Sequence, residues 1–160
     1  MENLNHLLKL LLESKIDFVL IGGYAAVLHG SSQVTQDIDI CAVISDVNLE
    51  ALRMTLRDLD PKHRMNPNFQ PSLMDYPAKG QKIDNYYLRT KSGILDIIQE
   101  VRPIGSFERV KENAITVSLF GHPCKVISLD DLIEVKKSMT RPKDKVTLDE
   151  LELLRRKTRA

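Results

Sequence analysis

Two short motifs near the N-terminus constrain the fold of this chain more than any other feature. The pair Gly22-Gly23 directly follows the apolar run Phe18–Ile21, and thirteen residues later Asp37-Ile38-Asp39 opens a second apolar run. This pattern predicts a buried strand, a tight glycine turn, a short helix and a second strand. Because strand side chains alternate between the two faces of a sheet, Asp37 and Asp39 are expected side by side on one face.

The acidic pair predicts a bound cation. Two carboxylates held this close repel each other, so a fold seldom keeps such a pair without a cation or a proton between them. Carboxylate oxygens suit Mg²⁺, which typically binds one or two carboxylates together with substrate phosphates. The alternative is an edge strand with a solvated acidic face. The apolar neighbours Ile38 and Ile40 instead favour a strand that is buried on at least one side.

The glycine pair and a third aspartate extend this hypothesis. Glycines between a strand and a helix let backbone N–H groups approach a phosphate, although a turn without any ligand has the same sequence. Asp96 is the one charged residue within the apolar segment Gly93–Ile98. An aspartate there is costly unless it is paired or binds a cation, so it is the best candidate for a third carboxylate. The alternative is a strand residue that faces outward.

The remaining segments predict helices and strands within one domain, 1–160. Leucine spacing predicts a helix over the first twelve residues and another from Asp46 to about residue 60. Further helices are expected at 106–112, from Ser128 and from Thr147, where Thr147 and Glu150 match a capping box. Hairpins are expected over 86–101 and 115–127. The proline-containing segment 62–81 is expected to be an irregular loop with at most a short strand, long enough to serve as a lid.

Composition removes several classes of protein. A net charge of +1 gives no global electrostatic argument for nucleic acid binding. The apolar runs are far shorter than the roughly 20 residues of a membrane helix, and the N-terminus does not have the pattern of a signal peptide. A cytoplasmic location without membrane contact is therefore expected. In that setting Cys41 and Cys124 are expected to be free thiols rather than a disulfide.

Taken together, these motifs resemble the nucleotidyltransferase superfamily, the fold shared by DNA polymerase beta and antibiotic nucleotidylyltransferases. The superfamily signature reads here as Ile21-Gly22-Gly23, then Asp37-Ile38-Asp39, then Asp96. A further resemblance links the chain to the abortive-infection and toxin–antitoxin members of that superfamily. It rests on Gly22-Gly23-Tyr24-Ala25, His29-Gly30, Thr35-Gln36-Asp37-Ile38-Asp39, Lys136 and Arg141-Pro142-Lys143-Asp144. The resemblance implies an α+β fold, in which a mixed sheet is flanked by helices and a helical segment spans about 128–160.

The resemblance also implies an activity: Mg²⁺-dependent transfer of a nucleoside monophosphate from an NTP to a hydroxyl group. The acceptor would be an RNA such as tRNA, a protein or a small molecule. In this assignment Asp37, Asp39 and Asp96 are the catalytic residues and hold two Mg²⁺ ions. The nucleotide would be bound by Gly22, Gly23, Lys136, Arg141 and Lys143. For Lys136, Arg141 and Lys143, the alternative is that they form a solvated basic helix end without a ligand.

Two positions depart from the pattern of the superfamily. Gly23 stands where many active members carry a serine that contacts the triphosphate, and Gln33 stands where relatives in the subgroup tend to carry an arginine. These departures keep open a catalytically silent protein that binds a nucleotide or a partner protein. A further alternative is a catalytic subunit that needs a separate acceptor-binding protein, because 160 residues leave little room for a large substrate domain.

Overall fold

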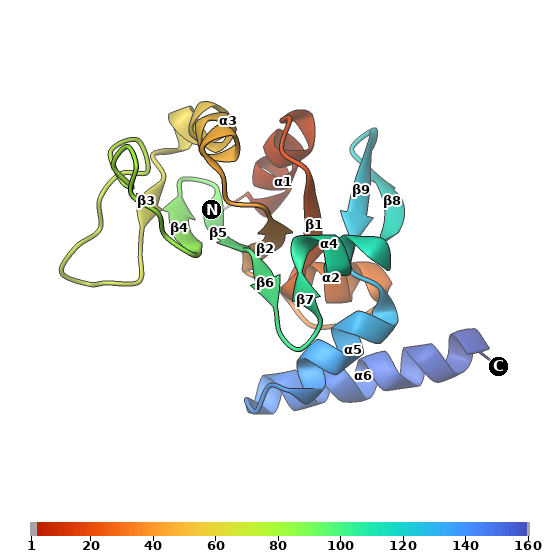
Figure 1. Cartoon of the computed structure of the whole chain (residues 1–160). Coiled ribbons are helices and arrows are strands. Elements are labelled where there is room, and N and C mark those ends of the chain that lie inside the picture. The colour runs from red at the N-terminus through yellow and green to blue at the C-terminus, as the bar shows by residue number, and fades with distance from the viewer. Residues whose placement is uncertain (1–2, 160) are drawn as a thin grey trace.

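The computed structural model describes residues 3–159, and its centre is a mixed seven-stranded sheet (Figure 1). The strands lie in the order β3-β4-β5-β2-β1-β9-β8. Their bounds are β1 Phe18–Ile21, β2 Asp37–Ala42, β3 Lys62–His63, β4 Tyr86–Thr90, β5 Gly93–Ile98, β8 Ile115–Leu119 and β9 His122–Val126. A separate small hairpin joins β6, Glu100–Val101, to β7, Gly105–Ser106.

Six helices surround this sheet within the described residues. They are α1 Leu4–Glu13, α2 Gly22–His29, α3 Asp46–Leu56, α4 Phe107–Glu112, α5 Leu129–Lys137 and α6 Pro142–Arg159. A turn of 3₁₀ helix, Arg57–Leu59, extends α3. In Figure 1, α5 and α6 cross below the sheet, next to α2, whereas α1 and α3 lie toward the opposite end. Together these elements confirm the expected α+β fold with a helical C-terminal segment.

The core explains why the first elements form. All four residues of β1 are buried, as its unbroken apolar sequence predicted. The helix α1 buries Leu7, Leu8 and Leu11 on one face and begins at Asn3, whose side chain accepts a hydrogen bond from the His6 N–H. These leucines pack in one core with the buried residues of the sheet. Within that sheet, β1 and β2 are paired neighbours.

Strand register brings the predicted site residues together. The strands β1 and β2 are antiparallel, with Ile21 opposite Asp39, and β2 and β5 are parallel, with Asp39 opposite Asp96. Adjacent strands lie about 4.8 Å apart, so the carboxylates of Asp39 and Asp96 project from neighbouring positions on one face. Asp37 lies two residues before Asp39 and therefore shares that face.

The start of the last helix corrects a sequence-based expectation. α6 begins at Pro142 and not at Thr147, whose hydroxyl lies inside the helix and donates to the Lys143 carbonyl at 3.0 Å. Proline suits the first helical position because its missing N–H would have no partner there. The buried Asp144 adds a negative charge to the first turn, where the helix dipole favours it. The capping-box pattern of Thr147 and Glu150 was therefore misleading.

Smaller differences concern the middle of the chain. The expected strand over 94–101 is interrupted at Gln99, because the chain leaves the main sheet and forms the hairpin of β6 and β7. The predicted irregular segment after residue 61 contains only the two-residue strand β3, as expected. Cys41 and Cys124 are buried free thiols. Among the described residues, no helix has the length and apolar character needed to cross a bilayer.

Candidate active site

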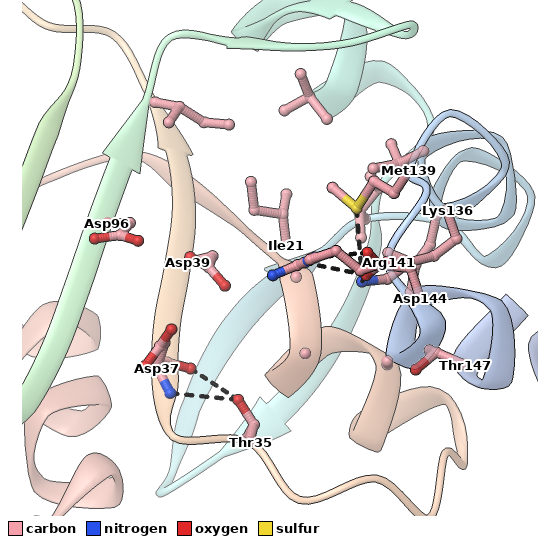
Figure 2. Close-up of a pocket in the computed structure, with 18 of the residues that line it drawn as sticks. Ile21, Thr35, Asp37, Asp39, Asp96, Lys136, Met139, Arg141, Asp144 and Thr147 are labelled. Carbon is pink, nitrogen blue, oxygen red and sulfur yellow. Dashed lines mark hydrogen bonds and ion pairs between the residues drawn. The ribbon is translucent and has the colours of Figure 1, made fainter.

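A pocket of about 760 Å³ lies between one end of the sheet and the helices α5 and α6. Figure 2 shows the carboxylates of Asp37, Asp39 and Asp96 on the sheet side and Lys136, Arg141 and Asp144 on the helix side. Every residue predicted for the site lines this pocket, namely Gly22, Gly23, Asp37, Asp39, Asp96, Lys136, Arg141 and Lys143. The structure thus brings together residues that are more than one hundred positions apart in the sequence.

Gly22 allows the closest approach within the site. It is the first residue of α2 and has a φ of +70°, which side chains other than that of glycine rarely adopt. A Cβ atom added at this position would overlap the Asp39 carboxylate, chiefly its Oδ2. β1 therefore passes into α2 without an intervening loop, and the N-terminus of the helix lies directly against a buried carboxylate.

The electrostatics of the sheet side favour a cation. The pKa of Asp39 is raised to about 7, first because of burial and then because of the charges of Asp96 and Asp37. The charges of Lys136 and Arg64 oppose this rise without cancelling it. A divalent cation would remove the repulsion, and carboxylate oxygens are the ligands that Mg²⁺ prefers. The chemistry of Asp37 and Asp39 is thus compatible with a metal ion, and their role as metal ligands stays a prediction.

Asp96 has a different environment from the other two carboxylates. Arg64 Nη2 donates to both Asp96 oxygens, Oδ1 and Oδ2, at 2.7 Å each. Burial raises the pKa of Asp96, and the Arg64 hydrogen bonds and charge partly offset that rise. Within residues 3–159, no three His, Cys, Asp or Glu side chains are arranged so that they could hold one metal ion. The two-ion arrangement expected for the three aspartates thus remains a prediction.

The helix side of the pocket is organised by a buried carboxylate. Asp144 has 0% exposure and accepts hydrogen bonds from Lys136 Nζ at 3.2 Å and from Arg141 Nε at 2.7 Å. Burial alone would raise the pKa of Asp144, but the hydrogen bonds and charges of Arg141 and Lys136 hold it below its ordinary value. Lys136 and Arg141 are therefore oriented side chains at the pocket wall. The alternative of a freely solvated basic helix end does not describe Lys136, which is buried.

Thr35 is a pocket residue to which the sequence analysis gave no role. Its hydroxyl donates to the Asp37 carbonyl at 3.0 Å, as drawn in Figure 2. A Cβ atom at Gly23 would lie 3.0 Å from Thr35 Oγ1. The absence of a side chain at Gly23 thus leaves room for the Thr35 hydroxyl beside the start of α2. The threonine in the Thr-x-Asp-x-Asp motif was the available signal.

Glu150 is a second residue whose role was missed. It accepts hydrogen bonds from the Ser31 hydroxyl at 3.1 Å, the Ser32 hydroxyl at 2.6 Å and the Ser32 N–H at 3.1 Å. Gln33 Nε2 also donates to it, at 3.3 Å. Glu150 therefore fastens the loop that leads to β2 onto α6. Gln33 stands where relatives in the subgroup tend to carry an arginine. It lines the pocket and takes part in the contact with Glu150.

His29, the last residue of α2, has a structural role. His29 Nε2 donates to the Ile127 carbonyl at 2.7 Å, and Gly30 ends α2 in the left-handed conformation. This contact joins α2 to the segment that follows β9. It agrees with a structural histidine and does not place the ring at the carboxylates.

Comparison with known proteins gives similarity at the level of structure. No protein-family model and no curated protein sequence matches the chain. The structure resembles the lincosamide antibiotic adenylyltransferase LnuA in its lincomycin-bound form, with a TM-score of 0.62 and 18% identity over 94% of this chain and 95% of that one. ANT(2")-Ia, in complex with adenylyl-2"-tobramycin, matches with a TM-score of 0.54 and 14% identity, covering 98% of this chain and 94% of that one.

A third similar structure is an antigenic nucleotidyltransferase-like protein from Paracoccidioides brasiliensis. Its TM-score is 0.53 at 16% identity, and the match covers 94% of this chain and 71% of that one. This chain has a nucleotidyltransferase-like fold. Identities of 14–18% establish the fold alone, so what the pocket can do depends on its own residues.

Proposed function

We propose that the protein transfers a nucleoside monophosphate from an NTP to a hydroxyl group of a small molecule. One observation carries this proposal: the glycine start of α2, the three aspartates and the cations of α5 and α6 line a single pocket. The similarity to LnuA and ANT(2")-Ia, whose structures hold lincomycin and adenylyl-2"-tobramycin, supports a small-molecule acceptor over an RNA or a protein. The toxin–antitoxin role suggested by the sequence motifs stays an untested prediction.

The phosphates would lie between the two walls of the pocket. Gly22 and Gly23 are the first two residues of the eight-residue helix α2. Backbone N–H groups at the start of a helix attract a negatively charged phosphate. Lys136, Arg141 and Lys143 would contribute positive charge from the other side. Asp37 and Asp39 would hold Mg²⁺, which when bound neutralises phosphate charge and polarises the phosphorus–oxygen bond.

The remaining carboxylate would handle the proton of the acceptor. Asp96 lines the pocket beside Asp39 and is hydrogen-bonded to Arg64, which favours its ionised form. It would accept the hydroxyl proton while the acceptor oxygen forms a bond to the α-phosphorus. The bond from that phosphorus to the bridging oxygen breaks in the same displacement, and pyrophosphate leaves with the electron pair. Arg141 is oriented to offset the charge of the leaving group.

Labelled nucleotides test the proposal directly. The protein would be incubated with Mg²⁺ and each α-³²P-labelled NTP, together with separate pools of hydroxylated small molecules, tRNA and proteins. We expect label to appear in the small-molecule pool with release of pyrophosphate, and Asp39→Asn to abolish it. Asp58→Asn, a change at an exposed carboxylate outside the pocket, is the matched control. Retained Mg·NTP binding without transfer to any pool would instead support the catalytically silent alternative.

A further inference from the structure

Arg64 occupies a defined position in a row of residues across the sheet. It follows β3, and its backbone N–H donates to the Tyr87 carbonyl on β4 at 3.0 Å. Tyr87 lies opposite Asp96, and Asp96 lies opposite Asp39. Arg64 therefore approaches Asp96 from the side away from Asp39. It is not among the lining residues of the pocket, although Tyr87 and Asp96 are.

The contact of Arg64 with Asp96 differs from an ordinary surface ion pair. One nitrogen, Nη2, lies 2.7 Å from both carboxylate oxygens, in the position between them that a cation would take. The side chains of Arg64 and Asp96 are only 21% and 15% exposed. Among the described residues, Arg64 is the one cation within ion-pair distance of any of the three aspartates.

Packing holds the guanidinium in place. Its central carbon lies 6.0 Å from the centre of the Tyr87 ring, and Nη1 lies 3.4 Å from Met65 Sδ. Nε is buried and has no hydrogen-bond partner. Water is thus excluded from one side of the guanidinium, which strengthens its attraction to Asp96. A ligand entering the pocket would meet Asp96 with Arg64 already behind it.

The charge balance of the site follows from this contact. A two-ion site spreads two divalent charges over its carboxylates and the phosphates. Here the guanidinium of Arg64, which is always protonated, already balances the charge of Asp96. Asp37 and Asp39 are the carboxylates that still lack a counter-charge among the described residues. We propose that Arg64 takes the place of a second metal ion, so that the site holds a single divalent cation, at Asp37 and Asp39. Arg64 is then a positioning residue that holds the Asp96 carboxylate in one orientation; this inference rests on the proposed function.

Counting bound Mn²⁺ tests the proposal without relying on activity. A nonhydrolysable NTP analogue would be kept limiting, with the protein in excess, and free Mn²⁺ would be followed by electron paramagnetic resonance. We expect one Mn²⁺ per bound nucleotide for the wild-type protein and two for Arg64→Met, because Asp96 then lacks a counter-charge. Arg89→Met, a change at an exposed arginine on β4, should still bind one.

The possible outcomes separate this inference from the proposed function. Two ions on the wild-type protein would overturn the role of Arg64 and leave nucleotidyl transfer standing. One ion on both the wild-type protein and a folded Arg64→Met variant would overturn it as well. If Arg64→Met does not fold, the wild-type count decides by itself between one ion and two. Failure of the wild-type protein to bind any metal–nucleotide complex would instead remove the proposed function, and this inference with it.

Discussion

At the scale of single residues, the site depends on a backbone position that tolerates no side chain. Gly22 combines a left-handed φ with direct contact to Asp39, so the glycine is required for two separate reasons. The first concerns stability, because side chains destabilise left-handed backbone. The second concerns the proposed function, in which a metal ion on Asp39 would also contact a phosphate at the start of α2, so the two have to lie close together. A matched pair of variants separates these two reasons.

We predict that Gly22→Ala lowers the free energy of unfolding by at least about 1 kcal/mol and abolishes Mg·NTP binding. Gly121→Ala is the control, because Gly121 has a similar φ of +78° but nothing within 4 Å of an added Cβ. It should lose only the roughly 1 kcal/mol that the left-handed backbone costs, less than Gly22→Ala, and bind nucleotide normally. Urea unfolding and calorimetric titration measure the two effects. Normal nucleotide binding by Gly22→Ala would contradict the close approach described for Asp39.

At the scale of elements, the junction of α5 and α6 determines where the cations point. The buried Asp144 ties the end of α5, through Lys136, to the residue before α6, through Arg141. An acidic residue in the first turn of a helix is already favourable, and here it also serves as counter-charge for a buried lysine. The angle between the two helices and the orientation of the pocket cations thus depend on one carboxylate.

We predict that Asp144→Asn destabilises the protein by about 3 kcal/mol at pH 7, because Lys136 keeps a buried charge without its partner. The pKa of Asp144 is held below its ordinary value in the folded protein, so its stabilising contribution is full above the unfolded pKa. That contribution is lost as the pH falls below about 3.8 toward the lowered folded value. The difference between the wild-type protein and the variant should therefore shrink in acid.

Urea unfolding at several pH values measures this difference. Lys137→Met is the control, because Lys137 is exposed and, among residues 3–159, pairs only with Glu134 on its own helix. Removing such a surface pair should cost well under 1 kcal/mol. An Asp144→Asn variant as stable as the wild-type protein at pH 7 would show that Asp144 does not hold the junction.

At the scale of the whole molecule, the pocket joins two parts of the structure that meet at one end of the sheet. One wall comes from α2 and from the strands β1, β2, β4, β5 and β6, and the other comes from α5 and α6. A ligand that contacts both walls has to restrain them relative to each other. The helices α1 and α3 contribute no residue to the pocket and pack elsewhere on the sheet.

Hydrogen exchange can detect this restraint. We predict that Mg·NTP slows amide exchange in α5, in the first turns of α6 and at the start of α2, because a bound triphosphate bridges these elements. Exchange in α1 and α3 should change little. Asp39→Asn with the same nucleotide serves as the control and should show no added protection. Protection limited to the sheet side would contradict a nucleotide that spans the pocket.

Much of this site could be predicted from sequence because the patterns that indicate it lie within short segments of the chain. Strand alternation placed Asp37 and Asp39 on one face, and an isolated charge in an apolar strand singled out Asp96. The glycine start of α2 followed directly from Gly22-Gly23. These patterns predicted the positions correctly because the strands and helices that carry them are regular and buried in the core.

The parts that could not be predicted depend on tertiary contacts. Arg64 lies after a two-residue strand in a segment without periodicity, so nothing in the sequence directs it to Asp96. Thr147 and Glu150 carry a capping pattern, but Pro142 starts the helix earlier and Glu150 binds the loop at Ser32 instead. A local capping motif is therefore a poor predictor where its side chain, here Glu150, binds a residue far away in the sequence.

The register of the sheet has a consequence for how this protein can change over evolution. Ile21, Asp39, Asp96 and Tyr87 are consecutive partners on four adjacent strands. Inserting or deleting one residue within such a strand would turn every following side chain to the opposite face. Gains and losses of residues should therefore be excluded from these strands among homologues and accumulate in the segment between β3 and β4. Within that segment we expect the changes in length to fall after Leu73, because Arg64 contacts Asp96 and Leu73 is buried in the core.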